Sequence, residues 1–205
     1  MYKCFGFFLT DDKGLGLFSG VEIIWQIGSD ATMSKLFLTI FNCLLMYAGW
    51  YGAIILASQD YPLLAALILL PIILWEVGSS SEPMKRGLFA LLFIVIGFFI
   101  ETTVISLGVV SYISPVSFVS GGAPLWVLGL WGIIGATFDD ILQWVKGDHP
   151  YKLALAGLIG APLASYSGSL IGAVSYPRGI IIGLAVSAII WAVLLPVMAK
   201  VRKYF

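Results

Sequence analysis

The chain has 205 residues and a formal net charge of zero; 60% of its residues are hydrophobic and only 11% are charged. A soluble domain carries about 25% charged residues, and it could not cover so much apolar surface because much of its own surface must face water. This composition excludes an ordinary soluble protein, and the balanced charge offers no basic face for nucleic acid. It favours an all-α polytopic transmembrane helix bundle.

The first 32 residues differ from the rest of the chain because charged residues and glycines are frequent there. Their apolar run Phe5–Leu9 is too short for the hydrophobic stretch of a secretory signal. Met33 stands directly before the first long apolar run and would be a natural start codon. We therefore interpret residues 1–32 as a leader, either disordered or an upstream mis-start, and residues 33–205 as the transmembrane domain.

Six apolar segments follow, most of them close to the roughly 20 residues that a helix needs to cross a membrane. Soluble core helices would carry a polar face, and these segments do not. The second segment is short and contains Pro71. The predicted spans are about Leu36–Ser58, Pro62–Val77, Gly87–Val110, Ala123–Val145, Leu153–Val174 and Gly179–Ala199.

The loops between these segments predict the orientation, since cytoplasmic loops are enriched in Lys and Arg. Eight basic residues fall on one side of the predicted bundle, and only Arg178 falls on the other. The eight are Lys35, Lys85, Arg86, Lys146, Lys152, Lys200, Arg202 and Lys203. We expect both termini in the cytoplasm and the loop Ser111–Gly122 outside, where its serine alternation suits a short strand or a re-entrant turn.

A stripe of small residues marks the fifth segment at four-residue spacing, which places the members on one helix face. In lipid, such residues allow two helix backbones to approach closely. We therefore predict that this helix packs against a neighbour along most of its length. The stripe comprises Ala156, Gly160, Ala164, Gly168 and Gly172.

Polar side chains at membrane depth are rare and by default suggest function. Counting 1.5 Å per residue from the basic loops places Glu101 and Tyr166 in one layer, roughly 21–22 Å above the cytoplasmic edge. Asn42 and Asp139 lie about 10 Å inside that edge and form a second layer with Asp140. We expect no ion-pair partner for the inward acid of this pair, which could be protonated, bond Asn42 or reach water.

Glu101 is the strongest candidate for a functional group, because no Lys or Arg is expected at its depth. It should face the protein interior near Tyr166 or another hydroxyl and be protonated much of the time. One interpretation is a neutral structural hydrogen bond, and the other is an ionisation that function requires. His149 is the only histidine and Cys4 lies far from Cys43, so we expect no metal and no cofactor.

Several motifs resemble domain-of-unknown-function family 2878, a group of small uncharacterised bacterial inner-membrane proteins. The resemblance rests on Ala123-Pro124-Leu125-Trp126 and on the run Gly160 to Gly168, and it extends over about Met33 to Lys200. The chain has Asp139-Asp140-Ile141 where an Asn-His-Ser stretch is expected, so a histidine role there cannot be transferred. The resemblance implies a bacterial inner-membrane location and a gene neighbourhood of fatty-acid-modifying enzymes.

Three functions remain open at this stage. The first is a membrane-embedded accessory factor linked to membrane-lipid modification or envelope stress, with membrane lipid and other membrane proteins as partners. The second is a small proton-coupled transporter or permease, based on Glu101 and the acidic pair. An intramembrane enzyme ranks third, because the spans lack a nucleophile–base pair and the acids Glu101 and Asp139 are expected about 12 Å apart in depth.

Overall fold

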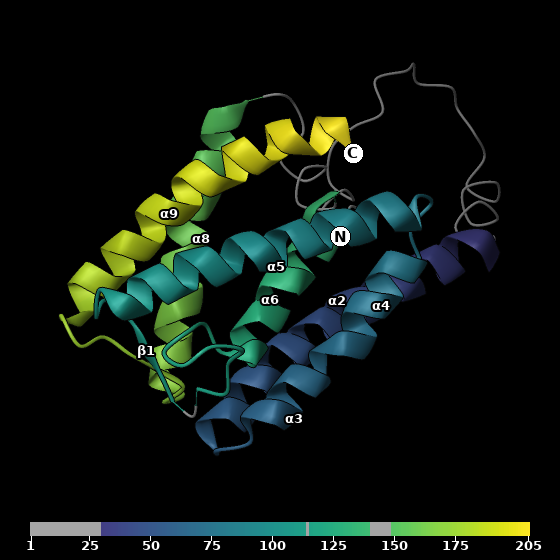
Figure 1. The fold of residues 1–205 in the computed structure, drawn as a ribbon. Coiled ribbons are helices and arrows are strands. Elements are labelled where there is room, and N and C mark those ends of the chain that lie inside the picture. Colours follow the sequence, from purple (N-terminus) through teal and green to yellow (C-terminus); the bar gives the residue numbers. More distant parts are fainter. Residues whose placement is uncertain (1–29, 114, 140–148) are drawn as a thin grey trace, which may run out of the picture.

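The computed structural model describes residues 30–113, 115–139 and 149–205, and side chains from residue 41 onward except Cys43. Most of the proposed leader, residue Asp140 and the end of the predicted fourth span therefore lie outside the described residues. The described part of the chain is mostly helical (Figure 1), as the apolar segments predict.

Most helix ends lie within four residues of the predicted spans, but the first helix begins six residues before Leu36, and the described helix in the fourth span ends at Ala136, nine residues before Val145. The helices are α2 (Asp30–Ser58), α3 (Pro62–Leu67), α4 (Leu69–Gly78), α5 (Pro83–Ser106), α6 (Leu125–Ala136), α8 (Pro150–Leu170) and α9 (Ile180–Val201), followed by the 3-10 turn η2 (Arg202–Tyr204). Prolines open α3, α5 and α8, where a missing backbone N–H costs nothing. The second predicted span is broken at Ile68, because Pro71 cannot donate the helical bond to Leu67.

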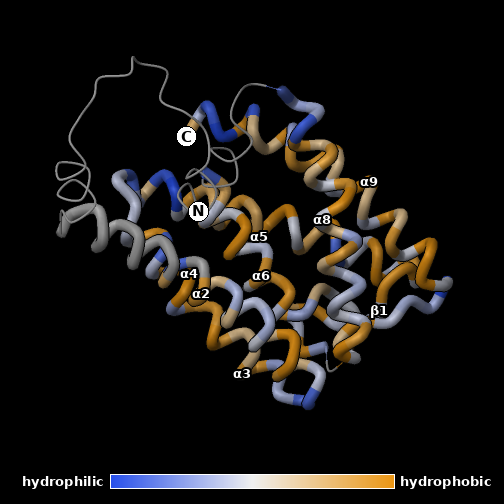
Figure 2. Tube along the Cα trace, turned by 180° about the vertical axis from the view of Figure 1, so that it is seen from behind, coloured by the Kyte–Doolittle hydropathy of each residue, from blue (hydrophilic) through white to orange (hydrophobic). Residues whose placement is uncertain are grey.

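Three of the described helical segments are long and apolar enough to cross a membrane: Pro83–Ser106, Pro150–Leu170 and Ile180–Tyr204. Shorter apolar helices cover Leu44–Ser58, Pro62–Gly78 and Leu125–Ala136. Hydrophobic residues dominate these helices, and hydrophilic ones gather near their ends (Figure 2).

Helix α6 forms the centre of the packing, with nine of its 12 residues buried. Its glycines bring it close to both neighbours: a Cβ on Gly135 would lie 2.7 Å from the Ala90 backbone of α5, and one on Gly129 would lie 2.6 Å from Leu69 of α4. Helices α8 and α9 form a separate antiparallel pair beside this group (Figure 1).

The two ends of the bundle are held by different interactions. At one end, the strand β1 (Ser111–Tyr112) after α5 pairs antiparallel with β2 (Val174–Ser175) after α8. This shows that the loop predicted as a strand or a turn contains a short strand. At the other end, the start of α5 and the end of α9 meet, and the rings of Phe89 and Phe205 are 5.4 Å apart.

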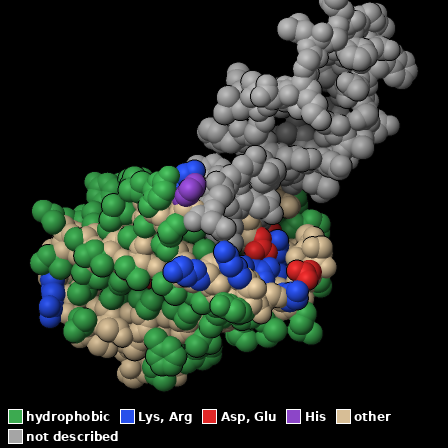
Figure 3. Space-filling view, turned by 90° about the horizontal axis from the view of Figure 1, so that it is seen from above, with side chains coloured by type: hydrophobic (Ala, Val, Ile, Leu, Met, Phe, Trp, Pro, Cys, Tyr) green, Lys and Arg blue, Asp and Glu red, His purple; other side chains and the backbone are tan. Residues whose placement is uncertain are grey.

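Asp139 joins these helix ends through an ion pair that the sequence did not predict. Its Oδ1 accepts from Nε of Arg202 and its Oδ2 accepts from Nη2 of the same residue, both at 2.7 Å. Arg86 lies 3.5 Å from Oδ2. The expectation that the inward acid lacks a partner is wrong for Asp139. A depth counted in residues along the helix axis ignores how far an arginine side chain reaches from its own backbone. Figure 3 shows Lys and Arg side chains gathered with Asp and Glu on one face.

Candidate functional site

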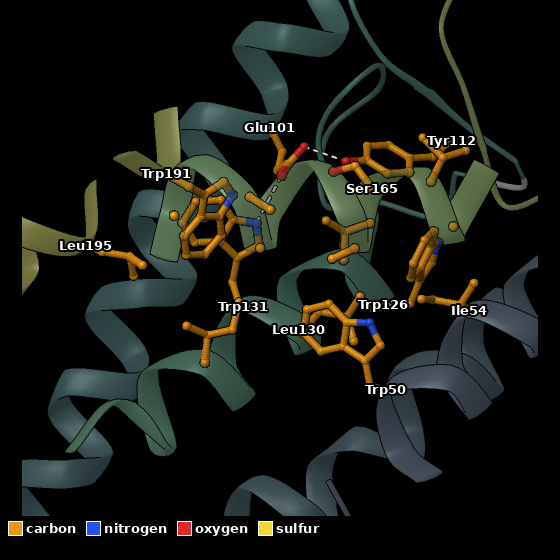
Figure 4. A pocket seen from close by; sticks show the side chains of 18 of the residues that line it. Trp50, Ile54, Glu101, Tyr112, Trp126, Leu130, Trp131, Ser165, Trp191 and Leu195 are labelled. Atoms are coloured by element: carbon orange, nitrogen blue, oxygen red, sulfur yellow. Dashed lines mark hydrogen bonds between the residues drawn. The ribbon is translucent and has the colours of Figure 1, made fainter. Parts of the chain in front are cut away.

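A cavity of about 320 Å³ separates the α8–α9 pair from α2 and α6. Its walls are largely apolar, and polar groups lie mainly toward one end (Figure 4). We call it the central cavity. Its lining includes Trp50 and Ile54 from α2, Trp126, Leu130, Trp131 and Ile134 from α6, Ala156, Gly160 and Ala164 from α8, and Trp191 and Leu195 from α9.

Tryptophan is concentrated in the lining, since four of the seven tryptophans in the chain contribute to it. The rings of Trp131 and Trp191 are stacked, with centroids 4.7 Å apart and planes 29° apart. Tyr112 meets Trp126 edge to face at 5.5 Å. These rings come from α6, α9 and β1, so they connect the two groups of helices.

Glu101 of α5 lies at the polar end of the central cavity, where it is partly buried and accepts one hydrogen bond on each carboxyl oxygen. Its Oε2 pairs with the Tyr112 hydroxyl at 2.6 Å, and its Oε1 accepts the indole N–H of Trp131 at 3.0 Å (Figure 4). The carboxyl therefore ties α5 to α6 and to the strand at the end of the bundle. The expectation of an inward-facing acid bonded to a hydroxyl agrees with this geometry, but the hydroxyl belongs to Tyr112.

A glycine allows Trp131 to reach Glu101. A Cβ on Gly97, one turn before Glu101 in α5, would lie 2.4 Å from the indole ring of Trp131. The ring can rest against α5 only because this side chain is missing. Gly97 thus belongs to the structure of the site even though it carries no chemistry.

The small-residue stripe of α8 lies along the central cavity. Ala156, Gly160, Ala164 and Gly168 all line it, and a Cβ on Gly160 would meet nothing within 4 Å. Gly172 lies beyond the end of α8 with a φ of 90°. The close approach to α9 occurs instead at Gly157, where a Cβ would lie 2.3 Å from the Trp191 carbonyl oxygen. The predicted packing face is therefore displaced by one residue, and the stripe forms a cavity wall.

The other predicted polar residues do not join Glu101. Tyr166 is 42% exposed and takes no part in the hydrogen bonds of the carboxyl. Asn42 accepts the indole N–H of Trp75 at 3.1 Å and so links α2 to α4, while Asp139 binds arginines at the opposite end of the bundle. Tyr166, Asn42 and Asp139 thus make their contacts away from the carboxyl of Glu101, which is the acid of the site.

Two further cavities adjoin the central one. A small cavity of about 70 Å³ shares Glu101, Tyr112 and Trp131 and continues toward Tyr176 and Ser187. A side cavity of about 450 Å³ shares Trp50, Ile134, Gly160 and Ala164 with the central cavity and adds the exposed Tyr47, Tyr51 and Leu163. The side cavity therefore extends from the central cavity to side chains that are exposed on α2 and α8.

The chemistry of the lining limits what the site can do. The described residues around the central cavity include no Lys, Arg or His. Among the described residues, no three His, Cys, Asp or Glu side chains lie together as metal ligands would. A long apolar space with one carboxyl at its end suits the binding of an amphiphilic molecule.

The fold and this site indicate a helical membrane protein with an internal apolar cavity. Residues 39–197 match the model of a family described as "Protein of unknown function (DUF2878)". The match covers most of the chain, so the chain belongs to this family, as its motifs predicted. Searches of the curated proteins and of the solved structures each find no match.

Proposed function

We propose that this chain is a multi-pass protein of the bacterial inner membrane that holds a lipid-like chain in its central cavity. In this proposal it acts as an accessory factor linked to membrane-lipid modification or envelope stress. It has six spans, with both termini in the cytoplasm. The observation that carries the proposal is an apolar cavity with a carboxyl at one end and an adjoining side cavity lined by α2, α6 and α8.

The distribution of basic residues supports the topology. Arg86 at the start of α5 and Arg202 after α9 meet at Asp139, so these two helix ends share one side of the bundle. Arg178 lies between β2 and α9, near the opposite end. An excess of basic residues at one end is typical of the cytoplasmic side.

The side cavity supports a lipid-like ligand. It is lined by α2, α6 and α8, and it connects to the central cavity through shared residues. An acyl chain could enter from the bilayer along this path without crossing the basic end. The small side chains of Gly160 and Ala164, which border both cavities, leave room for it.

Lipid profiling of a deletion strain tests the proposal. We expect a specific change in membrane fatty acids, which wild-type protein restores and Gly160→Leu does not, because the added side chain fills the cavity. Gly78→Leu is the matched control, since a Cβ there also meets nothing within 4 Å and Gly78 does not line the cavity. An unchanged lipid profile in the deletion strain would contradict the proposal.

A second candidate is a small proton-coupled transporter. The observation that favours it is the position of Glu101 between the central cavity and the small cavity beyond it, since an acid that borders two spaces could bind a proton or a solute from either. An unchanged lipid profile combined with altered uptake of an ion or solute would select this function. Glu101→Gln should then abolish uptake while the protein still accumulates.

A further inference from the structure

We infer that the polar end of the central cavity binds the ammonium group of an amphiphilic amine, with its hydrocarbon chain lying along the small-residue face of α8. This inference rests on the proposed function, because it names the headgroup of the molecule whose chain the cavity holds. It is carried by the acid, the aromatic rings and the absence of basic residues in the described lining.

The charges around the cavity favour a cation. Glu101 is the acid of the lining, and no Lys, Arg or His stands among the described residues that surround it. Its hydrogen bonds to Tyr112 and Trp131 use one site on each oxygen, whereas a carboxylate offers about four lone-pair sites. An ammonium stabilises the ionised form of this acid and can occupy the remaining sites, whereas a carboxylate or phosphate headgroup would be repelled by that form in an apolar space.

The aromatic side chains hold the carboxyl in place at this end of the cavity. Trp131 and Tyr112 turn their N–H and O–H groups toward Glu101, and Trp131 is stacked on Trp191 (Figure 4). The rings therefore fix the position of the acid at the cavity wall, where the ammonium of a bound amphiphile can reach it.

Trp126 adds a buried hydrogen-bond donor beside the cavity. It is 1% exposed and lines the central cavity, and its indole N–H has no hydrogen-bond acceptor among the described residues. Buried donors are rarely left without a partner. An oxygen near the head of an amphiphile would satisfy this donor, as a hydroxyl or ester oxygen close to the amine does.

The ammonium could come from a membrane lipid with an amine headgroup or from a free lipophilic amine. The chemistry that recognises it is the same in both cases. The two sources differ in the phosphate that an amine phospholipid also carries, so a zwitterionic probe distinguishes them.

Binding of probes that share one chain and differ in the headgroup tests the inference. The full chain is purified in non-ionic maltoside micelles at about pH 8, where an amine is protonated and a carboxylic acid is ionised. Dodecylamine, dodecanol and dodecanoate are titrated against tryptophan fluorescence, with affinity expressed per mole fraction in the micelle. Lysophosphatidylethanolamine with a lauroyl chain is the zwitterionic probe.

We expect dodecylamine to bind at least about tenfold tighter than dodecanoate, because attraction replaces repulsion at Glu101. Glu101→Gln should remove this difference, and circular dichroism together with thermal unfolding checks that the variant is folded. Binding of the zwitterion as tight as that of dodecylamine assigns the ammonium to a membrane lipid, and weaker binding assigns it to a free amine. Either result supports the inference.

Equal affinity for dodecylamine and dodecanoate would overturn the inference, and so would a preference for the amine that survives in Glu101→Gln. The proposed function fails in a different way. If the cavity holds no chain, then none of the probes binds, or Gly160→Leu binds all of them as well as Gly78→Leu does.

Discussion

Glu101 accepts hydrogen bonds from two donors on separate elements, Tyr112 of β1 and Trp131 of α6. Substitutions that keep or remove these bonds therefore measure what the carboxyl contributes. Glu101→Gln keeps an acceptor for the Trp131 N–H and supplies an amide to Tyr112, whereas Glu101→Ala leaves both groups without a partner. We expect Glu101→Ala to lose about 1–3 kcal/mol of stability, the cost of an unsatisfied buried polar group, and Glu101→Gln to lose much less. Thermal unfolding of the purified variants measures the difference.

The same two variants separate a structural role from a functional one. If the glutamine variant restores the lipid profile of the deletion strain and the alanine variant does not, the carboxyl is a structural partner of Tyr112 and Trp131. If both fail although both accumulate, its ionisation is required. Equal stability of the two variants would contradict the geometry of the hydrogen bonds.

Asp139 predicts a pH dependence of stability at the other end of the bundle. It lies beyond the end of α6, and the hydrogen bonds from Arg202 hold the pKa of its carboxyl below the usual range, against the burial that raises it. A group whose pKa is lowered in the folded state stabilises fully above its unfolded pKa of about 3.9, and this contribution is lost as the pH falls through the lower folded value. The wild type should therefore lose stability below about pH 4 more steeply than Asp139→Asn does.

At neutral pH, Asp139→Asn should cost about 2 kcal/mol, since a hydrogen bond to a charged group contributes about 1.5–3 kcal/mol. Glu82→Gln is the matched control. It breaks the ion pair between Glu82 and Lys85. The side chain of Lys85 is 50% exposed and that of Glu82 is 55% exposed, and such surface pairs contribute little to stability. Melting temperatures of the two variants measured side by side check the prediction, which fails if both variants lose the same stability.

At the scale of the helix, two neighbouring glycines of α8 should respond in opposite ways to enlargement. Gly157→Leu places a side chain against the backbone of α9 at Trp191, where nothing flexible can yield, so it should destabilise the bundle by about 1–3 kcal/mol or more. Gly160→Leu projects into the central cavity and should leave the melting temperature nearly unchanged while it blocks ligand binding. Equal losses of stability would mean that the cavity is closed.

The sequence predicts where the helices lie along the chain, but it does not predict which helices contact one another. Long apolar runs bounded by proline and basic residues give most helix ends within four residues, and the broken second span follows from Pro71. Four of the five residues of the stripe share one face of α8, since periodicity reports which residues share a face, and Gly172 lies beyond the helix end. Periodicity does not report what that face meets, and the structure places a cavity there and the helix contact at Gly157.

The site shows the same limit. Glu101 stands out because an acid at membrane depth is costly wherever the chain folds. Its partners do not stand out, since Trp131 lies 30 residues away and Tyr112 follows in a loop. The arginines of Asp139 are both expected on one side of the bundle, but their pairing with this acid depends on the positions of three helix ends in space. Depth can be counted along one helix, whereas distance between helices depends on the packing of all of them.

At the scale of the whole molecule, the fold consists of two helix groups with a cavity between them. One group surrounds α6, and the other is the α8–α9 pair (Figure 1). They are joined at one end by β1 and β2 and at the other by the Asp139 ion pair. Links at both ends and a cavity in the middle allow a chain-like ligand to lie within the bundle while the helix ends stay fixed.

The orientation of this arrangement in the membrane is the last prediction. Ser120 is exposed near the strand end of the bundle, and Ser81 is exposed before α5 at the basic end. With Cys4 and Cys43 replaced, Ser120→Cys should react with a membrane-impermeant maleimide in intact spheroplasts, and Ser81→Cys should react only after the membrane is opened. The physical reason is the excess of basic residues around Ser81, which favours the cytoplasm. A reporter fused after Phe205 should agree and be active only in the cytoplasm, because Arg202 shares the ion pair with Arg86 at the same end. Labelling of Ser81→Cys from outside would reverse the orientation, and labelling of both sites from outside would rule out the proposed six-span topology.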